Sequence, residues 1–226
     1  MKEPSIIVPF HNEEGCVAFV IEEILREFPD AEIVAIDDGS TDRTREILKR
    51  FERVRLIAFE QRLGQSAALW AGLRKATREI CVLMDGDGES DPRDIRALLK
   101  LLDTNDFACG YRIGRQDGAM KRIASAAANR LRKAVTKDSA KDTGAMKAIR
   151  RIHAPHLVPF EGMHRFVPAL LQGAGLTLGQ APVRARRRYA GKSKYGIWDR
   201  ARRGLLDLMG VKWIMSRRID PNKSDE

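Results

Sequence analysis

The sequence predicts an α/β fold built on a mainly parallel sheet that is flanked by helices. Over residues 1–120, short apolar runs alternate with amphipathic stretches, and this β-α-β-α order is typical of a parallel sheet between layers of helices. Polar residues gather directly after the apolar runs, where such sheets bind their ligands. With 226 residues, of which 43% are hydrophobic, the chain is long enough to bury a core.

Five strands are expected in the first half, because short apolar runs there are bounded by polar or turn-forming residues. They cover residues 5–9, 32–36, 54–59, 80–84 and 107–111. Four helices are expected between and after them, at residues 13–28, 41–51, 66–76 and 92–102. Apolar residues recur at helical spacing in the first helix, and Pro92 suits the first turn of the last. Ser40 or Thr41 is the expected cap of the second.

Beyond residue 120 the regular alternation ends. The sequence predicts an Ala-rich basic helix over residues 119–135, a short strand over 145–149, a helix over 161–171, one or two edge strands over 176–188, and one or two amphipathic helices over 197–216, broken near Gly210. We therefore divide the chain into a folded domain, residues 1–196, and an amphipathic tail, residues 197–226.

Charge is distributed unevenly along the chain. Residues 1–120 contain 17 Lys and Arg against 23 Asp and Glu, a balance of −6, whereas residues 121–226 contain 24 against 8, a balance of +16. The basic half indicates either an anionic partner, such as a phosphate or an acidic lipid surface, or a solvated basic face. A nucleic-acid-binding module is disfavoured, because it would leave the acidic clusters unexplained and aromatic residues make up only 6%.

The cysteines and the apolar runs bear on the cellular compartment. Three cysteines lie far apart without a CxxC pair, which argues against a disulfide framework or a zinc site and favours a reducing compartment. The first residues lack the pattern of a secretory signal, and no stretch reaches the roughly 18 consecutive apolar residues of a membrane span. We expect a cytoplasmic protein that is soluble or lies on the membrane surface.

Three polar clusters fall at the ends of predicted strands. They are His11-Asn12-Glu13, Asp37-Asp38-Gly39-Ser40 and Asp85-Gly86-Asp87. Because ligands of parallel sheets bind beyond the carboxyl ends of the strands, the coincidence predicts a site there.

Asp85 and Asp87 are candidate ligands of a divalent cation. Two carboxylates separated by one small residue can face the same hard cation, and Mg²⁺ and Mn²⁺ prefer such oxygen ligands together with substrate phosphates. Gly86 would allow a ligand to approach closely, and Glu89 could add a third oxygen. The alternative is an acidic turn that precedes the helix at Pro92.

Asp37 and Asp38 are candidate contacts of a nucleotide. A carboxylate at the end of the second strand could accept a hydrogen bond from a base N–H or a ribose hydroxyl. The alternative is a turn that caps the following helix. Glu13, at the end of the first strand, is open to the same two interpretations.

At these positions the sequence resembles the family 2 glycosyltransferases. Residues 6–14 (IIVPFHNEE) look like the opening motif of that family, and residues 36–44 (IDDGSTDRT) like its nucleotide-binding turn. Residues 63–69 (LGQSAAL) resemble its Gly-rich helix entry, and residues 84–92 (MDGDGESDP) its metal motif. The resemblance implies a GT-A fold over residues 1–196, with bound Mg²⁺ or Mn²⁺. It places these residues at the nucleotide: Pro9, His11, Glu13, Asp37, Asp38, Asp85 and Gly86.

The second half is similar to the branch that makes dolichyl- and polyprenyl-phosphate sugars. The similar segments are residues 110–112 (GYR), 142–148 (DTGAMKA), 161–170 (EGMHRFVPAL) and 188–195 (RYAGKSKY). The resemblance implies inverting transfer of a sugar from GDP-mannose or a UDP-hexose to a polyprenyl or dolichyl phosphate. A GT-A enzyme with a soluble glycan or glycolipid acceptor is the alternative. Many bacterial members continue into transmembrane helices, whereas this sequence ends after one amphipathic stretch.

An acceptor phosphate is already anionic at neutral pH, so it needs cationic positioning more than a general base. Arg can grip a phosphate with two hydrogen bonds, and Lys supplies a point charge. The candidates for catalysis are Asp87, Arg112, Arg122, Arg188 and Lys194, and for the last four the alternative is surface solvation. Ser193, His164, Arg165 and Asp142 are expected to contact the acceptor or to position the groups that do.

Residues 197–216 combine Trp198 and Trp213 with interleaved Lys and Arg. This pattern suits a membrane interface, where each basic residue near an anionic leaflet adds about 1 kcal/mol. A helix packed on the main domain is the compatible alternative. Recruitment by a separate membrane subunit stays open.

Overall fold

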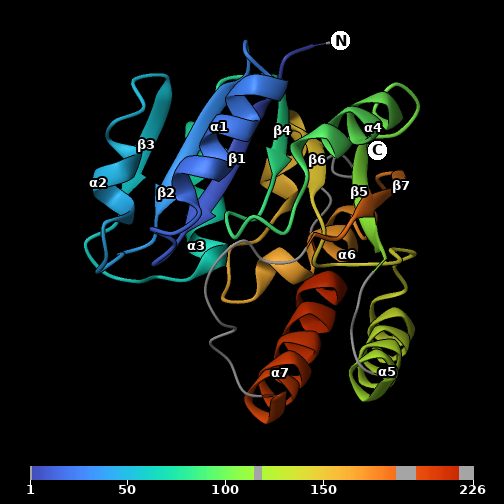
Figure 1. Cartoon of the computed structure of the whole chain (residues 1–226). Coiled ribbons are helices and arrows are strands. Elements are labelled where there is room, and N and C mark those ends of the chain that lie inside the picture. The colour runs from blue at the N-terminus through green and yellow to red at the C-terminus, as the bar shows by residue number, and fades with distance from the viewer. Residues whose placement is uncertain (1, 115–118, 187–196, 219–226) are drawn as a thin grey trace.

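The computed structural model describes residues 2–114, 119–186 and 197–218, with the side chains of these ranges except at 119–125 and 197–203. The described residues form a seven-stranded sheet with helices on both faces (Figure 1). The strands are β1 (Ser5–Phe10), β2 (Glu32–Asp37), β3 (Val54–Ala58), β4 (Ile80–Leu83), β5 (Phe107–Ile113), β6 (Lys147–Arg150) and β7 (Leu178–Arg184).

The sheet is mainly parallel, as expected. Its strand order is β3-β2-β1-β4-β6-β5-β7. Only β6 runs antiparallel to its neighbours among these described strands, and the other pairs are parallel. The five strands predicted in the first half and the strand at 145–149 are present. The stretch 176–188 contributes one edge strand, β7, in its described part.

Strands β1 to β4 are each followed by a helix that packs back onto the sheet. The helices are α1 (Val17–Glu27), α2 (Thr44–Leu48), α3 (Gln65–Lys75), the 3₁₀ turn η1 (Pro92–Asp94) and α4 (Ile95–Leu101). The expected cap of α2 is wrong: Asp42 Oδ1 accepts the N–H of Thr44 at 3.0 Å. Ser40 instead accepts the N–H of Asn12, at the end of β1.

The sheet separates two apolar cores. Ile6, Val8 and Phe10 of β1 pack on the face covered by α1 and α4, and Ile7 packs on the face covered by α3 and α6 (Val167–Gln172). Successive strand residues point to opposite faces, so β1 supplies both cores. Burial on both faces explains why these strands read as continuous apolar runs rather than as alternating patterns.

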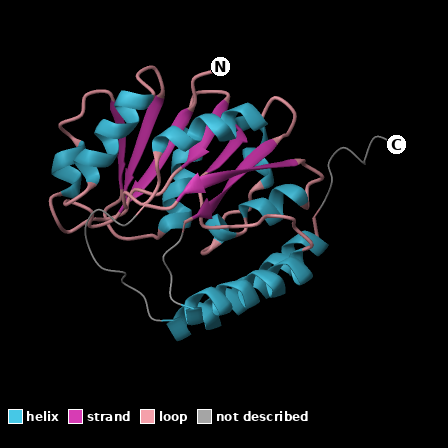
Figure 2. Cartoon of the chain, turned by 45° about the vertical axis from the view of Figure 1, so that its right-hand side comes forward, coloured by secondary structure: helices cyan, strands magenta, loops and turns pink. Residues whose placement is uncertain are grey.

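The second half adds two longer helices beside the sheet. They are α5 (Ala119–Thr136) and α7 (Ile197–Ser216), which contact each other. Both lie beyond the edge of the sheet at which β1 ends (Figures 1 and 2). Residues 151–172 form the 3₁₀ turns η2 (Arg151–His156) and η3 (Met163–Arg165), followed by α6. The single helix expected over 161–171 is therefore divided in two.

The expected break of α7 at Gly210 is wrong, because the helix continues through it. Leu208 and Val211, on either side of the glycine, are buried in the core of the α3 face. This packing outweighs the cost of about 1 kcal/mol that a glycine adds inside a helix. Arg218 donates to the carbonyl of Leu170 on α6 at 3.0 Å, so α7 is fastened to the domain. None of the helices in the described ranges is long and apolar enough to cross a bilayer.

Candidate active site

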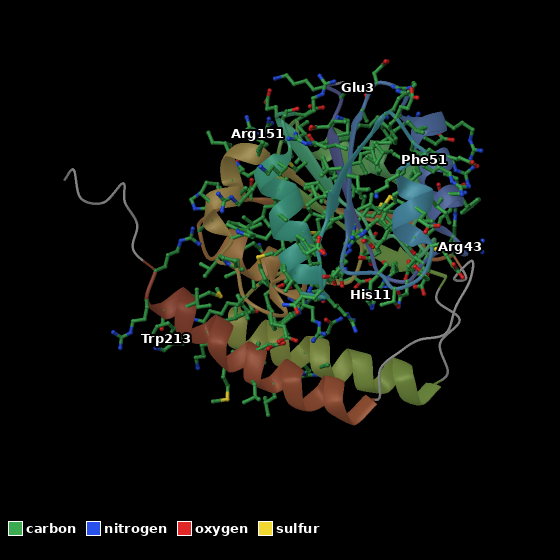
Figure 3. All side chains as sticks on the ribbon, turned by 90° about the vertical axis from the view of Figure 1, so that its left-hand side faces the viewer. Glu3, His11, Arg43, Phe51, Arg151 and Trp213 are labelled. Carbon is green, nitrogen blue, oxygen red and sulfur yellow. The ribbon has the colours of Figure 1, made fainter. Side chains whose placement is uncertain are left out.

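Hydrogen bonds join the loops that follow β1 and β2, at the carboxyl ends of these parallel strands. His11 Nδ1 lies 2.7 Å from the carbonyl oxygen of Asp38, and Asn12 Oδ1 accepts the N–H of Thr41 at 2.8 Å. Because the partner of His11 is a carbonyl, Nδ1 carries the proton in this contact. Figure 3 shows His11 at the edge nearest α5 and α7, and Glu3 at the opposite edge. The first two predicted clusters therefore lie side by side.

Asp37, the last residue of β2, is fully buried and is paired within the chain. Its Oδ2 lies 2.6 Å from Arg45 Nε, and its Oδ1 accepts the N–H of Ser40 at 3.2 Å. Arg45 also donates to the carbonyl of Phe59. The carboxylate thus joins the end of β2 to α2 and to the end of β3.

Asp38 holds the loop that leads into α3. Its carboxylate accepts the N–H of Leu63 at 2.7 Å and the N–H of Gly64 at 3.0 Å. Gly39 (φ 61°) lies so close to this loop that a Cβ would stand 2.4 Å from the Arg62 nitrogen. Asp38 therefore shapes the wall of the site, and its contact with a nucleotide remains a prediction.

Asp85 follows β4 and lies beside the loops of β1 and β3. Its Oδ1 accepts from Gln65 Nε2 at 2.6 Å. Burial, and then the neighbouring charge of Asp87, raise the pKa of Asp85 from 3.8 to about 6, while Lys147 and Arg112 oppose that rise. Asp87 Oδ1 accepts the N–H of Glu89 at 3.1 Å. Two carboxylates that repel each other in a partly buried position suit a divalent cation between or beside them.

Gly86 lies against the end of β1. A Cβ here would lie 2.6 Å from Phe10 Cδ1 and from the Pro9 carbonyl oxygen. A side chain larger than that of glycine would therefore collide with the end of β1, and the contact of Gly86 with a nucleotide remains a prediction. Cys16 Sγ lies 3.4 Å from the Gly86 carbonyl and from Glu13 Oε2, so Glu13 also faces this junction.

Lys147 is a site residue that the sequence reasoning missed. It is 6% exposed, and its Nζ donates to the carbonyls of Thr143 and Ala145 at 2.8 and 2.9 Å. In the sheet Lys147 pairs with Leu83 of β4, and Leu83 is two residues before Asp85 in the sequence. Burial lowers the pKa of Lys147, and the negative charge of Asp85 is one of the influences that oppose this shift. A lysine inside the apolar run 145–149 was the available signal, since a buried lysine needs acceptors or a counter-charge.

Arg112 and Asp142, predicted separately, form one ion pair. Arg112 Nε lies 2.8 Å from Asp142 Oδ2, and Nη2 lies 3.0 Å from Oδ1. Burial opposes ionisation of Asp142, but Arg112 overcomes it and lowers the carboxyl pKa to about 2. A Cβ at Gly144 would lie 2.4 Å from Arg112 Nη2, so the glycine admits the guanidinium. Asp142 thus orients Arg112.

His164 contacts Ser66 rather than standing alone as a base. Its Nδ1 lies 2.9 Å from Ser66 Oγ, and that oxygen also accepts the N–H groups of Gly162 and His164. The serine hydroxyl proton is therefore directed to Nδ1, which leaves the proton of the neutral imidazole on Nε2. Burial, reinforced by Arg165 and Lys147, lowers the pKa of His164 to about 3. Such a histidine is neutral at physiological pH and favours positioning over proton transfer.

The remaining predicted residues divide into two groups. Arg165 lies 3.7 Å from Asp207 on α7, a contact that joins η3 to that helix. The side chain of Arg122, and residues Arg188, Ser193 and Lys194, lie outside the described residues. Among the described residues, no group of three or more His, Cys, Asp or Glu side chains could hold a metal ion.

A mainly parallel sheet with acidic loops after β2 and β4 on one edge places the protein in the GT-A class of α/β folds. The chain belongs to glycosyl transferase family 2, whose family model matches residues 5–155.

Two relatives define its neighbourhood in that family. The chain is 33% identical to a dodecaprenyl-phosphate galacturonate synthase of Rhizobium johnstonii, over 97% of this chain and 69% of the relative. It is 28% identical to an undecaprenyl-phosphate 4-deoxy-4-formamido-L-arabinose transferase of Edwardsiella ictaluri, over 91% of this chain and 65% of the relative. The chain therefore spans about two thirds of the length of these proteins.

Among solved structures, the fold is similar to glucosyl-3-phosphoglycerate synthase from Mycobacterium tuberculosis. The complex of that enzyme with phosphoglyceric acid gives a TM-score of 0.72 at 19% identity, over 97% of this chain and 82% of that one. Its complex with Mn²⁺, UDP and glucosyl-3-phosphoglycerate gives 0.69 at 20%, with the same coverage. At this identity the likeness shows the fold alone.

Proposed function

We propose that this protein is an inverting glycosyltransferase that moves a sugar from a nucleotide-diphosphate sugar to a polyprenyl phosphate at the cytoplasmic face of a membrane. The observation that carries the proposal is the Asp85–Asp87 pair that follows β4. The positive charges of Lys147 and Arg112 are close enough to Asp85 to act on its carboxylate. Family membership supports the reaction class. The polyprenyl phosphates in the names of both relatives support the acceptor. The donor is GDP-mannose or a UDP-hexose.

Asp85 and Asp87 are the residues that would hold Mg²⁺ or Mn²⁺. Glu89 does not complete a three-carboxylate group with them in the described structure, so phosphate oxygens of the donor would supply further ligands. The oxygen donors and mutual repulsion of Asp85 and Asp87 fit a hard divalent cation. The bound cation would neutralise and orient the departing diphosphate. Gln65, which donates to Asp85, holds one of the two carboxylates in place.

The acceptor phosphate needs orientation rather than deprotonation. Arg112 is fixed by Asp142 for such a role, and Arg122, Arg188 and Lys194 are proposed to assist it. Neutral His164, held by Ser66, is proposed to position the acceptor side of the site. In the catalytic step the phosphate oxygen attacks the anomeric carbon of the sugar, and the bond to the nucleoside diphosphate breaks.

The outer side of α7 supports a position on an anionic membrane. Leu205, Leu206, Met209 and Trp213 are 52–64% exposed, with Lys212 and Arg217 exposed beside them. Figure 3 shows Trp213 projecting from α7 away from the sheet. Exposed apolar residues flanked by basic ones suit the boundary between lipid headgroups and acyl chains. The opposite side of α7 packs on the domain, so one side of the helix can contact a membrane while the other side stays in the protein core.

The decisive experiment is a transfer assay with UDP- and GDP-sugars, Mn²⁺ or Mg²⁺, and a short-chain polyprenyl phosphate in solution. Lipid-linked sugar that forms only with the phosphate acceptor supports the proposal. Transfer to a soluble glycan or a glycolipid, with none to the lipid phosphate, would establish the alternative acceptor class. A thermal-shift screen of the nucleotides with and without metal identifies the donor, because a ligand that binds the native state raises its stability.

Membrane binding is tested separately with protein-free anionic vesicles. Trp213→Ser combined with Leu206→Ser is expected to lower binding severalfold, and Ile152→Ser, which alters an exposed apolar residue on η2, serves as the control. If wild-type protein does not bind these vesicles, direct membrane contact through α7 is wrong, and recruitment by a separate membrane subunit becomes the explanation to test.

A further inference from the structure

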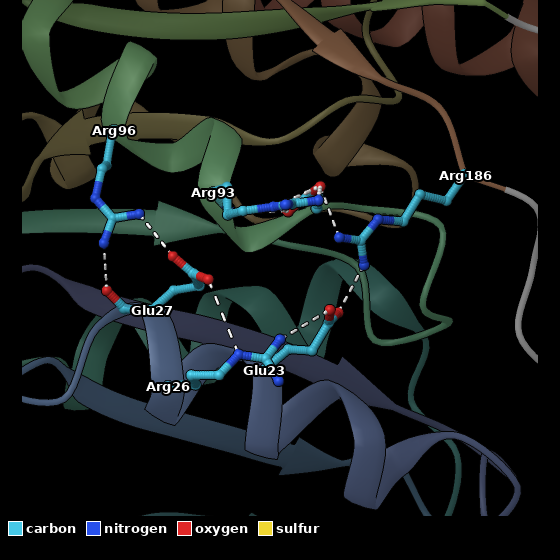
Figure 4. Close-up of polar contacts among 7 residues, drawn as sticks. Glu23, Arg26, Glu27, Arg93, Arg96 and Arg186 are labelled. Carbon is cyan, nitrogen blue, oxygen red and sulfur yellow. Dashed lines mark hydrogen bonds and ion pairs between the residues drawn. The ribbon is translucent and has the colours of Figure 1, made fainter.

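Arg186 joins three parts of the chain that are distant in sequence. Two residues after β7, its Nη1 lies 2.6 Å from Glu23 Oε2 on α1, and its Nη2 lies 2.6 Å from Asp91 Oδ2. Its backbone N–H donates to the carbonyl of Glu89 at 3.0 Å. Figure 4 shows its guanidinium reaching from the end of β7 to Glu23 on α1. The sequence showed only a basic run, RARRRYAGKSK, without distinguishing this arginine from its neighbours.

Both carboxylates that Arg186 bridges are buried. Asp91 is 1% exposed and Glu23 is 9% exposed. Burial opposes ionisation of Asp91, yet its arginine partners hold the carboxyl pKa at about 2. Removing one partner from a buried ion pair is costly because the other charge remains without compensation. Arg186 is thus built into the interior of this junction.

The other arginines of the cluster are tied more locally. Arg93 also pairs with Asp91, at 2.7 Å, but it is two residues away on the same turn and its side chain is 56% exposed. Arg26 reaches Glu23 at 3.4 Å within α1 and is 67% exposed. Arg186, at 24% exposure, is the partner that links this turn and α1 to the end of β7.

A short path of hydrogen bonds leads from Arg186 to the proposed metal ligands. Arg186 N–H holds the Glu89 carbonyl, and Glu89 N–H donates to Asp87 Oδ1 at 3.1 Å. Between them, Gly88 has a φ of 77°, a left-handed conformation that allows the chain to turn sharply. Asp91, on the far side of Glu89, is held by the Arg186 side chain. Arg186 therefore holds the segment that follows Asp87 at two points, the backbone carbonyl of Glu89 and the side chain of Asp91.

We propose that Arg186 is a positioning residue for the divalent-cation site, acting through Glu89 and Asp91 to hold Asp87 in its ligating orientation. The inference rests on the proposed function and adds a role that belongs to neither the cation ligands nor the predicted phosphate contacts. Residues that orient metal ligands typically contribute about 10- to 100-fold to metal affinity. A role limited to folding would lower stability and leave the affinity of the folded protein unchanged.

The test compares Arg186→Gln with Arg93→Gln, a matched loss of one arginine at the same carboxylate. Binding of Mn²⁺ is followed by calorimetry in the presence of UDP or GDP, whichever stabilises the wild-type protein, at a temperature at which each variant is fully folded by circular dichroism. Arg186→Gln is expected to raise the Mn²⁺ Kd about tenfold, and Arg93→Gln less than about twofold. Arg186→Lys, which keeps the charge but cannot bridge both carboxylates, should lie between Arg186→Gln and wild type, and it decides the matter if Arg186→Gln does not fold.

Two results would overturn the inference while the proposed function stands. One is an unchanged Mn²⁺ Kd in folded Arg186→Gln, or in Arg186→Lys where only that variant folds. The other is an equal loss in Arg93→Gln, which would assign the effect to Asp91 alone. If the wild-type protein shows no metal-dependent nucleotide binding, the proposed function itself fails, and the role of Arg186 fails with it.

Discussion

Two acidic pairs stand at the ends of β2 and β4, the strands on either side of β1, and their surroundings differ. Asp37 and Asp38 are satisfied from within the chain, by Arg45 and by backbone N–H groups. Asp85 receives a hydrogen bond from Gln65, and burial beside Asp87 raises its pKa to about 6. The first pair stabilises the loops that shape the site, whereas the second concentrates negative charge that a cation would relieve. Two acidic pairs that look similar in the sequence therefore lie in different surroundings, and we expect a structural role for the first pair and cation binding by the second.

The largest expected effect is on catalysis, from the second pair. Asp87→Asn should lower turnover at least about 100-fold, because metal-assisted charge stabilisation contributes several kcal/mol to the transition state. Its unfolding free energy should change little. Initial rates at saturating metal, compared with the surface variant Asp103→Asn, measure this effect. Turnover like that of wild type would remove the metal role of Asp87 and with it the contrast between the pairs.

The first pair should give the largest loss of stability. Asp37→Asn weakens the charge-assisted hydrogen bond with Arg45, whose side chain is 29% exposed, so we expect a loss of about 1.5–3 kcal/mol. Urea unfolding in metal-free buffer measures it. If the variant unfolds like wild type but binds nucleotide more weakly, Asp37 is a ligand contact, and the structural role assigned to the first pair is wrong.

Asp85→Asn should change stability in the opposite direction. The folded-state pKa of about 6 lies above the ordinary value of 3.8, so the ionised carboxylate is disfavoured in the folded protein. The penalty is absent below about pH 4, grows as pH rises and is complete above about pH 6. It amounts to at most about 3 kcal/mol, given 1.36 kcal/mol per pKa unit. In metal-free buffer the variant should be more stable than wild type at pH 7 and equal to it near pH 4. A loss of stability at pH 7 would contradict the charge repulsion.

The sequence predicted the strands of the first half well because a buried parallel sheet requires continuous apolar runs, as in 5–9 and 32–36. It placed the polar clusters together because strand direction fixes which ends share an edge. It could not predict that Arg112 pairs with Asp142, or that Lys147 lies behind Asp85. Those contacts depend on β6 running antiparallel between β4 and β5, an arrangement that local patterns do not encode.

The continuity of α7 and the ion pairs of Arg186 could not be predicted from the sequence for a related reason. Gly210 reads as a break, yet the burial of Leu208 and Val211 keeps α7 continuous. Arg186 reads as one more cation in a basic run, and only the positions of Glu23 and Asp91 distinguish it. In each case the deciding partner lies far away in sequence, so tertiary packing overrides the local preference.

The smallest expected effect concerns Asp38, for which the sequence left two roles open. Its carboxylate accepts the N–H groups of Leu63 and Gly64, so Asp38→Asn, which keeps one acceptor oxygen, should cost about 1 kcal/mol through the lost hydrogen bond. Because the loop of Leu63 leads to Gln65, which contacts Asp85, the loosened loop should also raise the apparent donor KM modestly, with little change in kcat. Unfolding curves and donor titrations on the same preparation separate the two roles. A KM increase of tenfold or more with unchanged stability would mean that Asp38 contacts the nucleotide directly, and the first pair would then combine both functions.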